Sequence, residues 1–110
     1  MTELTYLATP YSHPDAAVRQ ARFDAVNGVA ARMMAEGQHV FSPISHGHSI
    51  ALAGDLPTGW EYWATMDRRH LGICTRLVVL RLDGWRESVG VQHEIEIAEA
   101  MGIPVEFIDA

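Results

Sequence analysis

The sequence predicts an α/β domain built on a small, doubly wound parallel sheet with flanking helices. Short apolar, β-prone runs alternate along the chain with longer segments whose apolar residues recur at helical spacing. The run Leu77–Leu80 contains no polar residue, which is typical of a strand covered on both faces. Strands that alternate with helices favour a parallel sheet with right-handed crossovers.

A strand and a long helix are expected first. Leu4–Ala8 is apolar and β-prone, which predicts a buried strand. Pro14 suits the first turn of a helix, with Ser12 or His13 as its N-cap. Gly37 is expected to end this helix. Its apolar positions recur at helical spacing: Val18, Ala21, Ala25, Val29 and Met33.

The middle of the chain is expected to hold a strand, a long loop and a second helix. Residues 38–42 predict a short strand, and residues 43–57 predict a long loop. Thr58 and Glu61 have the spacing of a capping box, a hydroxyl followed three residues later by a carboxylate. The second helix is therefore expected over residues 59–72.

The last third is expected to hold a strand at 76–82, a helix at 91–101 ended by Gly102, and a strand at 104–108. The resulting order of elements fits a flavodoxin-like or Rossmann-like sheet. There is no internal repeat, low-complexity segment or linker, so residues 1–110 are expected to form a single domain.

In such sheets, ligands bind beyond the carboxyl ends of the strands. This rule groups three loops, at residues 9–13, 42–56 and 83–90, around one mouth. Candidate functional residues are therefore sought in these loops and at the helix ends that follow them.

Composition excludes several classes of function. The chain has 110 residues, a formal net charge of −6 and no lysine, which excludes Schiff-base, pyridoxal phosphate and P-loop chemistry. Its arginines are scattered, so duplex nucleic acid is not an expected partner. The first apolar run is too short for a signal peptide, and no run is long enough to span a membrane. With Cys74 as the single cysteine, these features predict a soluble, cytoplasmic protein.

Glu94 is the first candidate for catalysis. It is expected near the N-terminus of the third predicted helix, where the helix dipole would keep its carboxylate ionised. An ionised carboxylate at a cleft can act as a nucleophile or stabilise a cation. On position alone, Glu94 could equally be a surface acid that complements the dipole.

Asp67 is the second candidate, because it is an acid on an apolar stripe. It lies four residues from both Trp63 and Leu71, and burial there would raise its pKa and suit it to donate a proton. The alternative is a partly buried acid paired with an arginine such as Arg68. A charged Glu94 beside a neutral Asp67 would be a typical acid/base assignment.

Histidines and small residues in the mouth loops are candidates for substrate binding. His46 and His48 look like metal ligands, but a zinc site needs three or four ligands and the other histidines are scattered. No metal is therefore expected, and both are assigned to substrate contact or to structure. Ser88 and Gly90 offer a hydroxyl and free amides at a helix start, which fits an anion nest or an ordinary cap.

The loop after the first strand also belongs to the predicted mouth. Thr9, Pro10, Tyr11 and Ser12 are candidate substrate contacts there. The aromatic rings of Tyr11 and Trp85 could stack on a base, although aromatic residues in such loops are as often lids or interface residues.

These residues together resemble the nucleoside 2-deoxyribosyltransferase-like superfamily, including its small deoxynucleotide N-glycosidases and a bacterial and phage subfamily. Tyr6 stands in a first strand similar to that of the family. Asp67 precedes the apolar strand 78–80, as the family's helix aspartate does. Glu94 ends a Gly-x-x-x-Glu pattern that precedes the last strand, near residues 102–105.

The resemblance implies cleavage of the N-glycosidic bond of a (deoxy)nucleoside or its 5′-monophosphate, by hydrolysis or transfer. Glu94 would attack the anomeric carbon, Asp67 would protonate the leaving base and Tyr6 would hold Glu94. The nucleotide hydrolases have a serine near the phosphate at the position of Ser88, which favours a monophosphate and hydrolysis. No cofactor is implied, and family members assemble into dimers or larger homo-oligomers.

Two other hypotheses remain open at this point. One is a non-catalytic nucleotide sensor that binds in the same cleft without turnover. The other is a different enzyme, such as a dinucleotide glycohydrolase or a metal-dependent hydrolase that uses His46 and His48. Because the loop at residues 9–13 lacks the glycine and arginine typical of nucleotide hydrolases, the base, the sugar and the acceptor also stay open.

Overall fold

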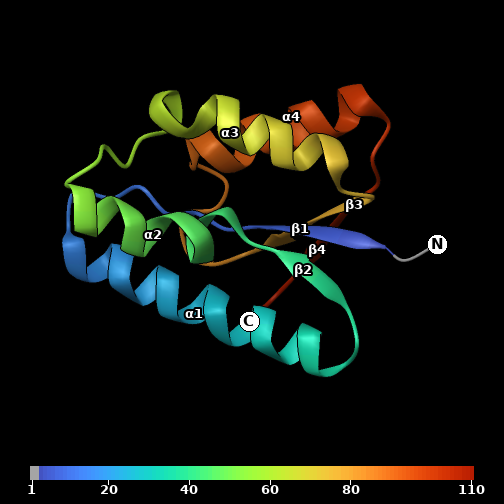
Figure 1. Cartoon of the computed structure of the whole chain (residues 1–110), viewed down its shortest axis with the longest axis horizontal. Helices are drawn as coiled ribbons and strands as arrows, with labels where there is room; N and C mark the ends of the chain where they lie inside the picture. Colours follow the sequence, from blue (N-terminus) through green and yellow to red (C-terminus); the bar gives the residue numbers. More distant parts are fainter. Residues whose placement is uncertain (1–2) are drawn as a thin grey trace.

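The computed structural model describes residues 3–110, which form a four-stranded sheet and four helices (Figure 1). All strand pairs are parallel and the strand order is β2-β1-β3-β4, which confirms the predicted α/β fold. In chain order the elements are β1 (Leu4–Ala8), α1 (Ala16–Ala35), β2 (His39–Phe41), α2 (Pro43–Gly54), α3 (Trp60–Ile73), β3 (Arg76–Leu80), α4 (Val89–Met101) and β4 (Val105–Ile108).

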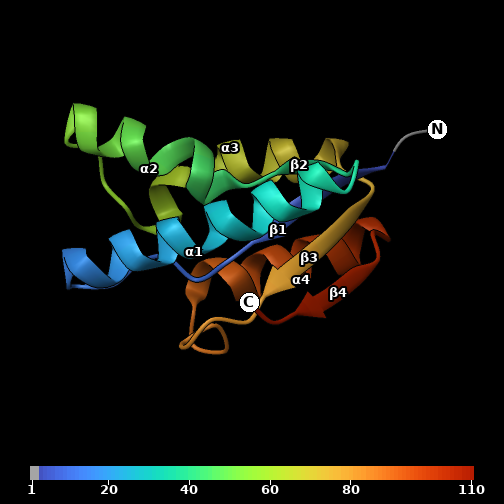
Figure 2. The same ribbon diagram turned by 90° about the horizontal axis from the view of Figure 1, so that it is seen from below.

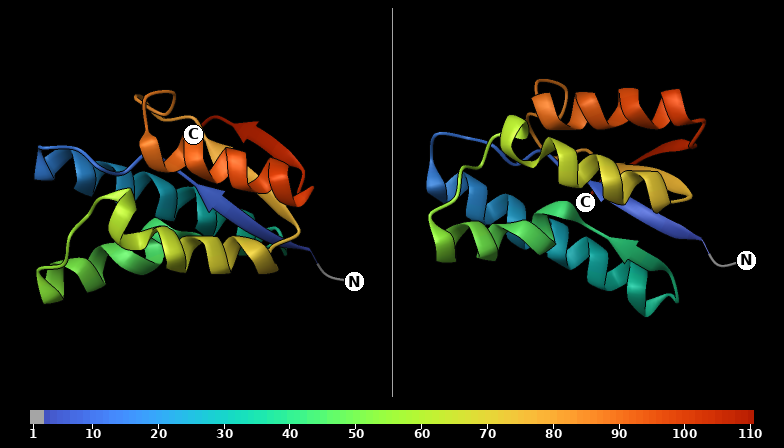
Figure 3. Two further views of the ribbon diagram at one scale, coloured as in Figure 1. Left: turned by 90° about the horizontal axis from the view of Figure 1, so that it is seen from above. Right: turned by 45° about the horizontal axis from the view of Figure 1, so that its top comes forward.

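Helices cover both faces of the sheet. On one face, Val26 of α1 belongs to a buried cluster with Leu7 of β1, and Figure 2 shows this face with α1 across it. On the other face, α3 and α4 lie side by side, and their residues Leu71 and Val91 are buried with Tyr6 (Figures 1 and 3). Successive strand residues point to opposite faces, so β1 and β3 are buried on both, as their apolar runs predict.

The strand order defines where a ligand crevice should open. From β1 the chain goes through α1 to β2 at one edge, and it later returns on the other side of β1 to form β3 and then β4. The direction of strand addition therefore reverses between β1 and β3. In doubly wound sheets, ligands bind outside the carboxyl ends of the strands at this switch point.

The predicted loop at residues 43–57 is wrong, because most of it is the helix α2. Ser42 caps this helix by accepting a hydrogen bond from the Ser45 amide at 3.0 Å, and Pro43 occupies its first turn. Its buried residues recur at helical spacing, from Pro43 through His48 to Ala51. The serine, histidine and glycine content of the segment concealed this periodicity.

Other helix starts also differ from the sequence prediction. Asp15, not Ser12 or His13, is the N-cap of α1, and its side chain accepts from the Ala17 amide at 2.8 Å. The predicted capping box at Thr58 is absent, since Gly59 is the N-cap of α3 and makes no side-chain hydrogen bond. The three predicted helices nevertheless begin within two residues of their expected starts; α4, for example, begins at Val89. β1 has its predicted bounds, whereas β2, β3 and β4 are shorter than predicted by one to two residues, and β2 and β3 end earlier.

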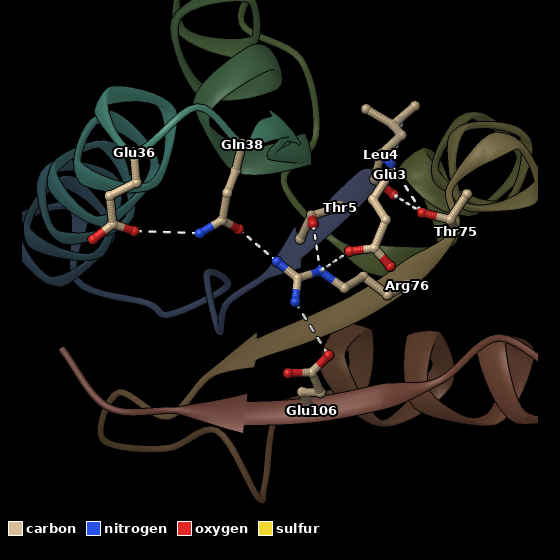
Figure 4. Close-up of polar contacts among 8 residues, drawn as sticks. All are labelled: Glu3, Leu4, Thr5, Glu36, Gln38, Thr75, Arg76 and Glu106. Atoms are coloured by element: carbon tan, nitrogen blue, oxygen red, sulfur yellow. Dashed lines mark hydrogen bonds and ion pairs between the residues drawn. The ribbon is translucent and has the colours of Figure 1, made fainter. Parts of the chain in front are cut away.

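A polar cluster joins the strands at the end of the sheet opposite the crevice (Figure 4). Arg76 of β3 donates through Nε to Thr5 Oγ1 at 2.7 Å, and through Nη2 to Gln38 Oε1. Its Nη1 atom donates to Glu106 Oε2 on β4 at 3.2 Å, and Glu3 lies 3.9 Å from Nε. The guanidinium group thus links β1, β3 and β4 with the segment that leads into β2, which assigns this cluster a structural role.

Among residues 3–110, no helix has the length and the apolar composition needed to cross a membrane.

Candidate active site

One cavity lies beyond the carboxyl ends of β1 and β3, at the switch point of the sheet. Its walls come from the β1–α1 loop and from α2, α3 and α4, together with the residues that lead into α3 and α4. Most of the predicted site residues line it, namely Thr9, Tyr11, Ser12, His48, Asp67, Ser88, Gly90 and Glu94. Residues from four separate segments of the sequence therefore meet in one place.

Glu94 is buried at the base of this cavity, with 4% of its surface exposed. The hydroxyl group of Tyr6, which is fully buried in β1, donates a hydrogen bond to Glu94 Oε2. Burial raises the pKa of Glu94 to about 8; the Tyr6 hydrogen bond lowers it, and the nearby Asp67 charge raises it. The pKa of Tyr6 is itself raised by burial and by Glu94, so this phenol remains a donor.

The prediction that Glu94 is an ionised residue at a helix end is therefore wrong for the free protein. Glu94 is the sixth residue of α4, beyond the first turn to which the dipole effect is mainly confined. Burial disfavours the charged form much more strongly than the dipole favours it. The surface-acid alternative is also excluded by this burial.

Asp67 is buried on α3, as its place on the apolar stripe predicts. Burial raises the pKa of Asp67 to about 6, and the charge of His70 acts in the opposite direction. Asp67 raises the pKa of both Glu94 and Tyr6, so the two carboxyl groups are close enough to interact. None of the ion pairs found within residues 3–110 involves Asp67, which leaves the predicted arginine partner without support.

The β1–α1 loop forms another wall of the cavity. Tyr11 hydrogen-bonds through its hydroxyl to His48 Nδ1, and Ser12 Oγ donates to the Thr58 carbonyl at 2.8 Å. Thr9 is 4% exposed, and its Oγ1 atom has no hydrogen-bond partner in the described part of the chain. The loop thus presents one polar wall whose hydrogen-bonding capacity is only partly used.

Three predicted substrate contacts do not reach the cavity. His46 and His48 are two residues apart on a helix, about 200° around its axis, so they lie on different sides of α2. His46 instead lies near Phe41 and His70. Trp85 packs against Phe107, with the Arg86 guanidinium over its ring.

Pro10 is the third predicted substrate contact that does not reach the cavity. Its side chain is fully buried, and it is not among the lining residues.

Two tryptophans that the sequence argument did not assign to the site line the cavity. Trp60 stacks on His93 at a centroid distance of 5.3 Å, and Trp63 donates through Nε1 to the Pro57 carbonyl at 2.8 Å. Both share the stripe of α3 that carries Asp67. This shared stripe was the available signal, but its helical spacing fits a buried face or an oligomer interface equally well.

Helix N-termini converge on the cavity. Its lining includes residues from the first turn of three helices, Ile44 of α2, Trp60 of α3 and Val89 of α4. Each N-terminus carries a partial positive charge, so their convergence favours an anionic ligand. Ser88 caps α4 by accepting from the Val91 amide at 3.2 Å.

Metal binding has no geometric support in the described residues 3–110. No group of three or more histidine, cysteine, aspartate or glutamate side chains is arranged there to hold an ion. Both ring nitrogens of His48 are already engaged, with Tyr11 and with Gln20 Oε1 at 3.1 Å.

Comparison with known proteins gives a family but no activity. No curated protein matches the chain in sequence. The model of one family, described as a domain of unknown function (DUF1937), matches residues 3–109 and therefore covers the sheet, the helices and the whole cavity. The chain belongs to the DUF1937 family.

Proposed function

We propose that this protein cleaves the N-glycosidic bond of a (deoxy)nucleoside or its 5′-monophosphate. The observation that carries the proposal is the buried Glu94 carboxyl group, held by Tyr6 at the base of a cavity that Asp67 also lines. Two interacting carboxyl groups beneath an aromatic wall match the needs of a retaining glycosidic cleavage. The resemblance to the nucleoside 2-deoxyribosyltransferase-like superfamily agrees with these roles.

In the first step, a carboxylate oxygen of Glu94 attacks the anomeric carbon of the pentose. The bond from that carbon to the base nitrogen breaks, and its electron pair leaves with the base. The base takes up the proton of the Asp67 carboxyl group. This step leaves a sugar ester on Glu94, a free base and an ionised Asp67.

In the second step, water or a second base attacks the anomeric carbon of the ester. For water, the Asp67 carboxylate accepts the released proton while the ester bond to Glu94 breaks. Glu94 leaves as a carboxylate and Asp67 is protonated again. The sugar is released with the anomeric configuration that it had in the substrate.

Other lining residues fit the remaining parts of such a substrate. The rings of Trp60 and Trp63 offer a stacking surface for the base on the same helix as Asp67. A 5′-phosphate would be favoured near Ser88, where the N-terminus of α4 presents backbone amides. This arrangement supports a nucleoside monophosphate and hydrolysis as the finer form of the proposal.

The two carboxyl groups share one proton across the neutral range. With pKa values of about 6 for Asp67 and about 8 for Glu94, the proton of the free protein resides mainly on Glu94. Moving it to Asp67, as the first step requires, costs about 3 kcal/mol for two pKa units. The positive charge that develops on the sugar offsets this cost because it favours an ionised Glu94.

We therefore expect a bell-shaped dependence of kcat/KM on pH. Below about pH 6 both carboxyl groups are protonated and the nucleophile is lost, whereas above about pH 8 both are ionised and the acid is lost. Initial rates measured from pH 4.5 to 9.5 in overlapping buffers test this expectation. A rate that is flat through pH 9.5 would exclude an acid with these properties.

The direct test is base release from a panel of nucleosides and 5′-monophosphates, modified pyrimidines included, followed by chromatography. We expect release from at least one class of substrate. The Glu94→Gln variant, prepared in the same way, controls for contaminating enzymes. Equal release by the variant and the wild type would contradict the proposed mechanism.

A second candidate is a non-catalytic nucleotide sensor that uses the same cavity. One observation favours it: burial holds the pKa of Glu94 at about 8, so the free protein has little ionised nucleophile at neutral pH. This candidate predicts a rise in Tm with nucleotides, but no base release anywhere in the panel.

A further inference from the structure

A directional chain of hydrogen bonds runs from the surface of α1 to the cavity. Gln20 Nε2 donates to Asp24 Oδ1 at 3.1 Å, which turns the amide oxygen of Gln20 toward His48. An amide oxygen can only accept, so the Nε2 atom of His48, 3.1 Å away, carries a proton. In the neutral ring Nδ1 is then an acceptor, and it takes its hydrogen bond from the Tyr11 hydroxyl group.

The surroundings of His48 favour the neutral form of its ring and fix its orientation. Burial lowers the pKa of His48 and the positive charge of Arg19 lowers it further, whereas the negative charge of Asp24 acts in the opposite direction. The ring of Phe23 stacks on the imidazole with 4.2 Å between centroids and 29° between planes. The orientation of the Tyr11 hydroxyl is thus set by a ring whose pKa is lowered by burial and whose rotation is restricted by Phe23 and by two hydrogen bonds.

As a consequence, Tyr11, which lines the cavity, can offer its hydroxyl oxygen to a ligand only as a hydrogen-bond acceptor. Its only hydrogen is directed to His48, and the Arg19 side chain hydrogen-bonds to the same oxygen, which leaves one lone pair for a ligand. Thr9 lines the same cavity, and its buried Oγ1 atom lacks a partner among the described residues. Buried hydroxyl groups almost always have a partner, so this one points to a group supplied by a ligand.

We propose that the Tyr11 and Thr9 hydroxyl groups together recognise a ring hydroxyl of the pentose. This inference rests on the proposed function, since it takes the ligand to be a nucleoside or nucleotide. A sugar hydroxyl donates one hydrogen bond and accepts others, so it satisfies the acceptor on Tyr11 and the hydroxyl of Thr9 at once. Thr9 directly follows β1 and lines the same cavity as Glu94 and the tryptophans of α3.

Binding of sugars without a base tests this recognition independently of turnover. The probes are D-ribose, 2-deoxy-D-ribose and 3-deoxy-D-ribose, each as the free sugar and as its 5-phosphate, titrated in ¹H–¹⁵N spectra. We expect loss of one ring hydroxyl to weaken binding to the wild type about 5- to 10-fold. In Tyr11→Phe and Thr9→Val, that same loss is expected to change Kd less than 2-fold.

Control variants separate recognition from a general structural effect. Tyr62→Phe makes the same chemical change on the exposed side of α3, outside the cavity, and should keep the wild-type selectivity. Gln20→Leu removes the acceptor that fixes the His48 tautomer, so it should reduce selectivity although Gln20 does not line the cavity. This result would identify Gln20 and His48 as positioning residues.

The outcomes distinguish this inference from the proposed function. The proposed recognition is overturned if Tyr11→Phe weakens the binding of all three sugars by the same factor. It is also overturned if the wild type binds the three sugars equally well. Both conclusions hold even where base release persists. Hydroxyl-selective binding without base release from any nucleoside would instead keep the sugar site and overturn glycosidic cleavage.

Discussion

We expect the Glu94→Gln variant to release base at least ~10³-fold more slowly than the wild type, measured as kcat on the substrate that the panel identifies. The amide keeps the size of the carboxyl group and can still accept the hydrogen bond from Tyr6. It cannot form the ester with the sugar, because its oxygen is a far weaker nucleophile. The loss should therefore appear in the chemical step rather than in KM.

The matched control is Glu96→Gln on the same helix. Glu96 is exposed and does not line the cavity, so its replacement should leave kcat within about 2-fold of the wild-type value. Mass spectrometry during turnover should detect a sugar adduct on the wild type and none on Glu94→Gln. Equal kcat values for Glu94→Gln and the wild type would remove Glu94 from the mechanism.

The sequence was sufficient to predict the architecture because apolar patterning and glycine stops report directly on packing. β1 is found at Leu4–Ala8 as predicted, and α1 ends before Gly37, whose φ of 92° suits glycine. The strand order could not be predicted in the same way. Each parallel strand is apolar on both faces, so its pattern does not indicate its neighbours.

The missed helix α2 had the largest effect on the prediction of the site. In a loop, the side chains of His46 and His48 could point toward the same site. In the helix α2 they lie on different sides of the helix axis. The segment includes glycine and several serines, which have only moderate or poor helix propensity. Ser42, Pro43 and the tertiary contacts of its buried face supply the helix with its start and its stability.

The position of Asp67 on a buried stripe was predictable from spacing, but the burial of Glu94 was not. Which residues of α4 face the sheet depends on how α4 packs across β3. That packing depends on the strand order as well as on helical periodicity. The contact between Tyr6 and Glu94 joins residues 88 positions apart. From the sequence, that contact entered only through the resemblance to a known family.

The buried Glu94 should also make the stability of the fold depend strongly on pH. Its pKa is raised from 4.5 to about 8, so the folded state retains a proton that the unfolded chain has lost between these values. The free energy of unfolding should therefore fall as pH rises from about 4.5 to 8. A shift of this size corresponds to up to about 5 kcal/mol, a large share of the roughly 5–15 kcal/mol that stabilises a typical domain.

Comparison of Glu94→Gln with the wild type isolates this effect, because the other titrating groups are common to both proteins. At pH 5 the variant should be about as stable as the wild type, or slightly less stable if the new amide hydrogens lack acceptors. At pH 9 it should be the more stable protein by several kcal/mol, with a higher urea midpoint and an unchanged m-value. A difference in midpoint that is the same at pH 5 and pH 9 would mean that Glu94 is ionised in the free protein throughout. In that case the nucleophile would be ready before substrate binds, and the acid limb of the rate profile would have to come from another group.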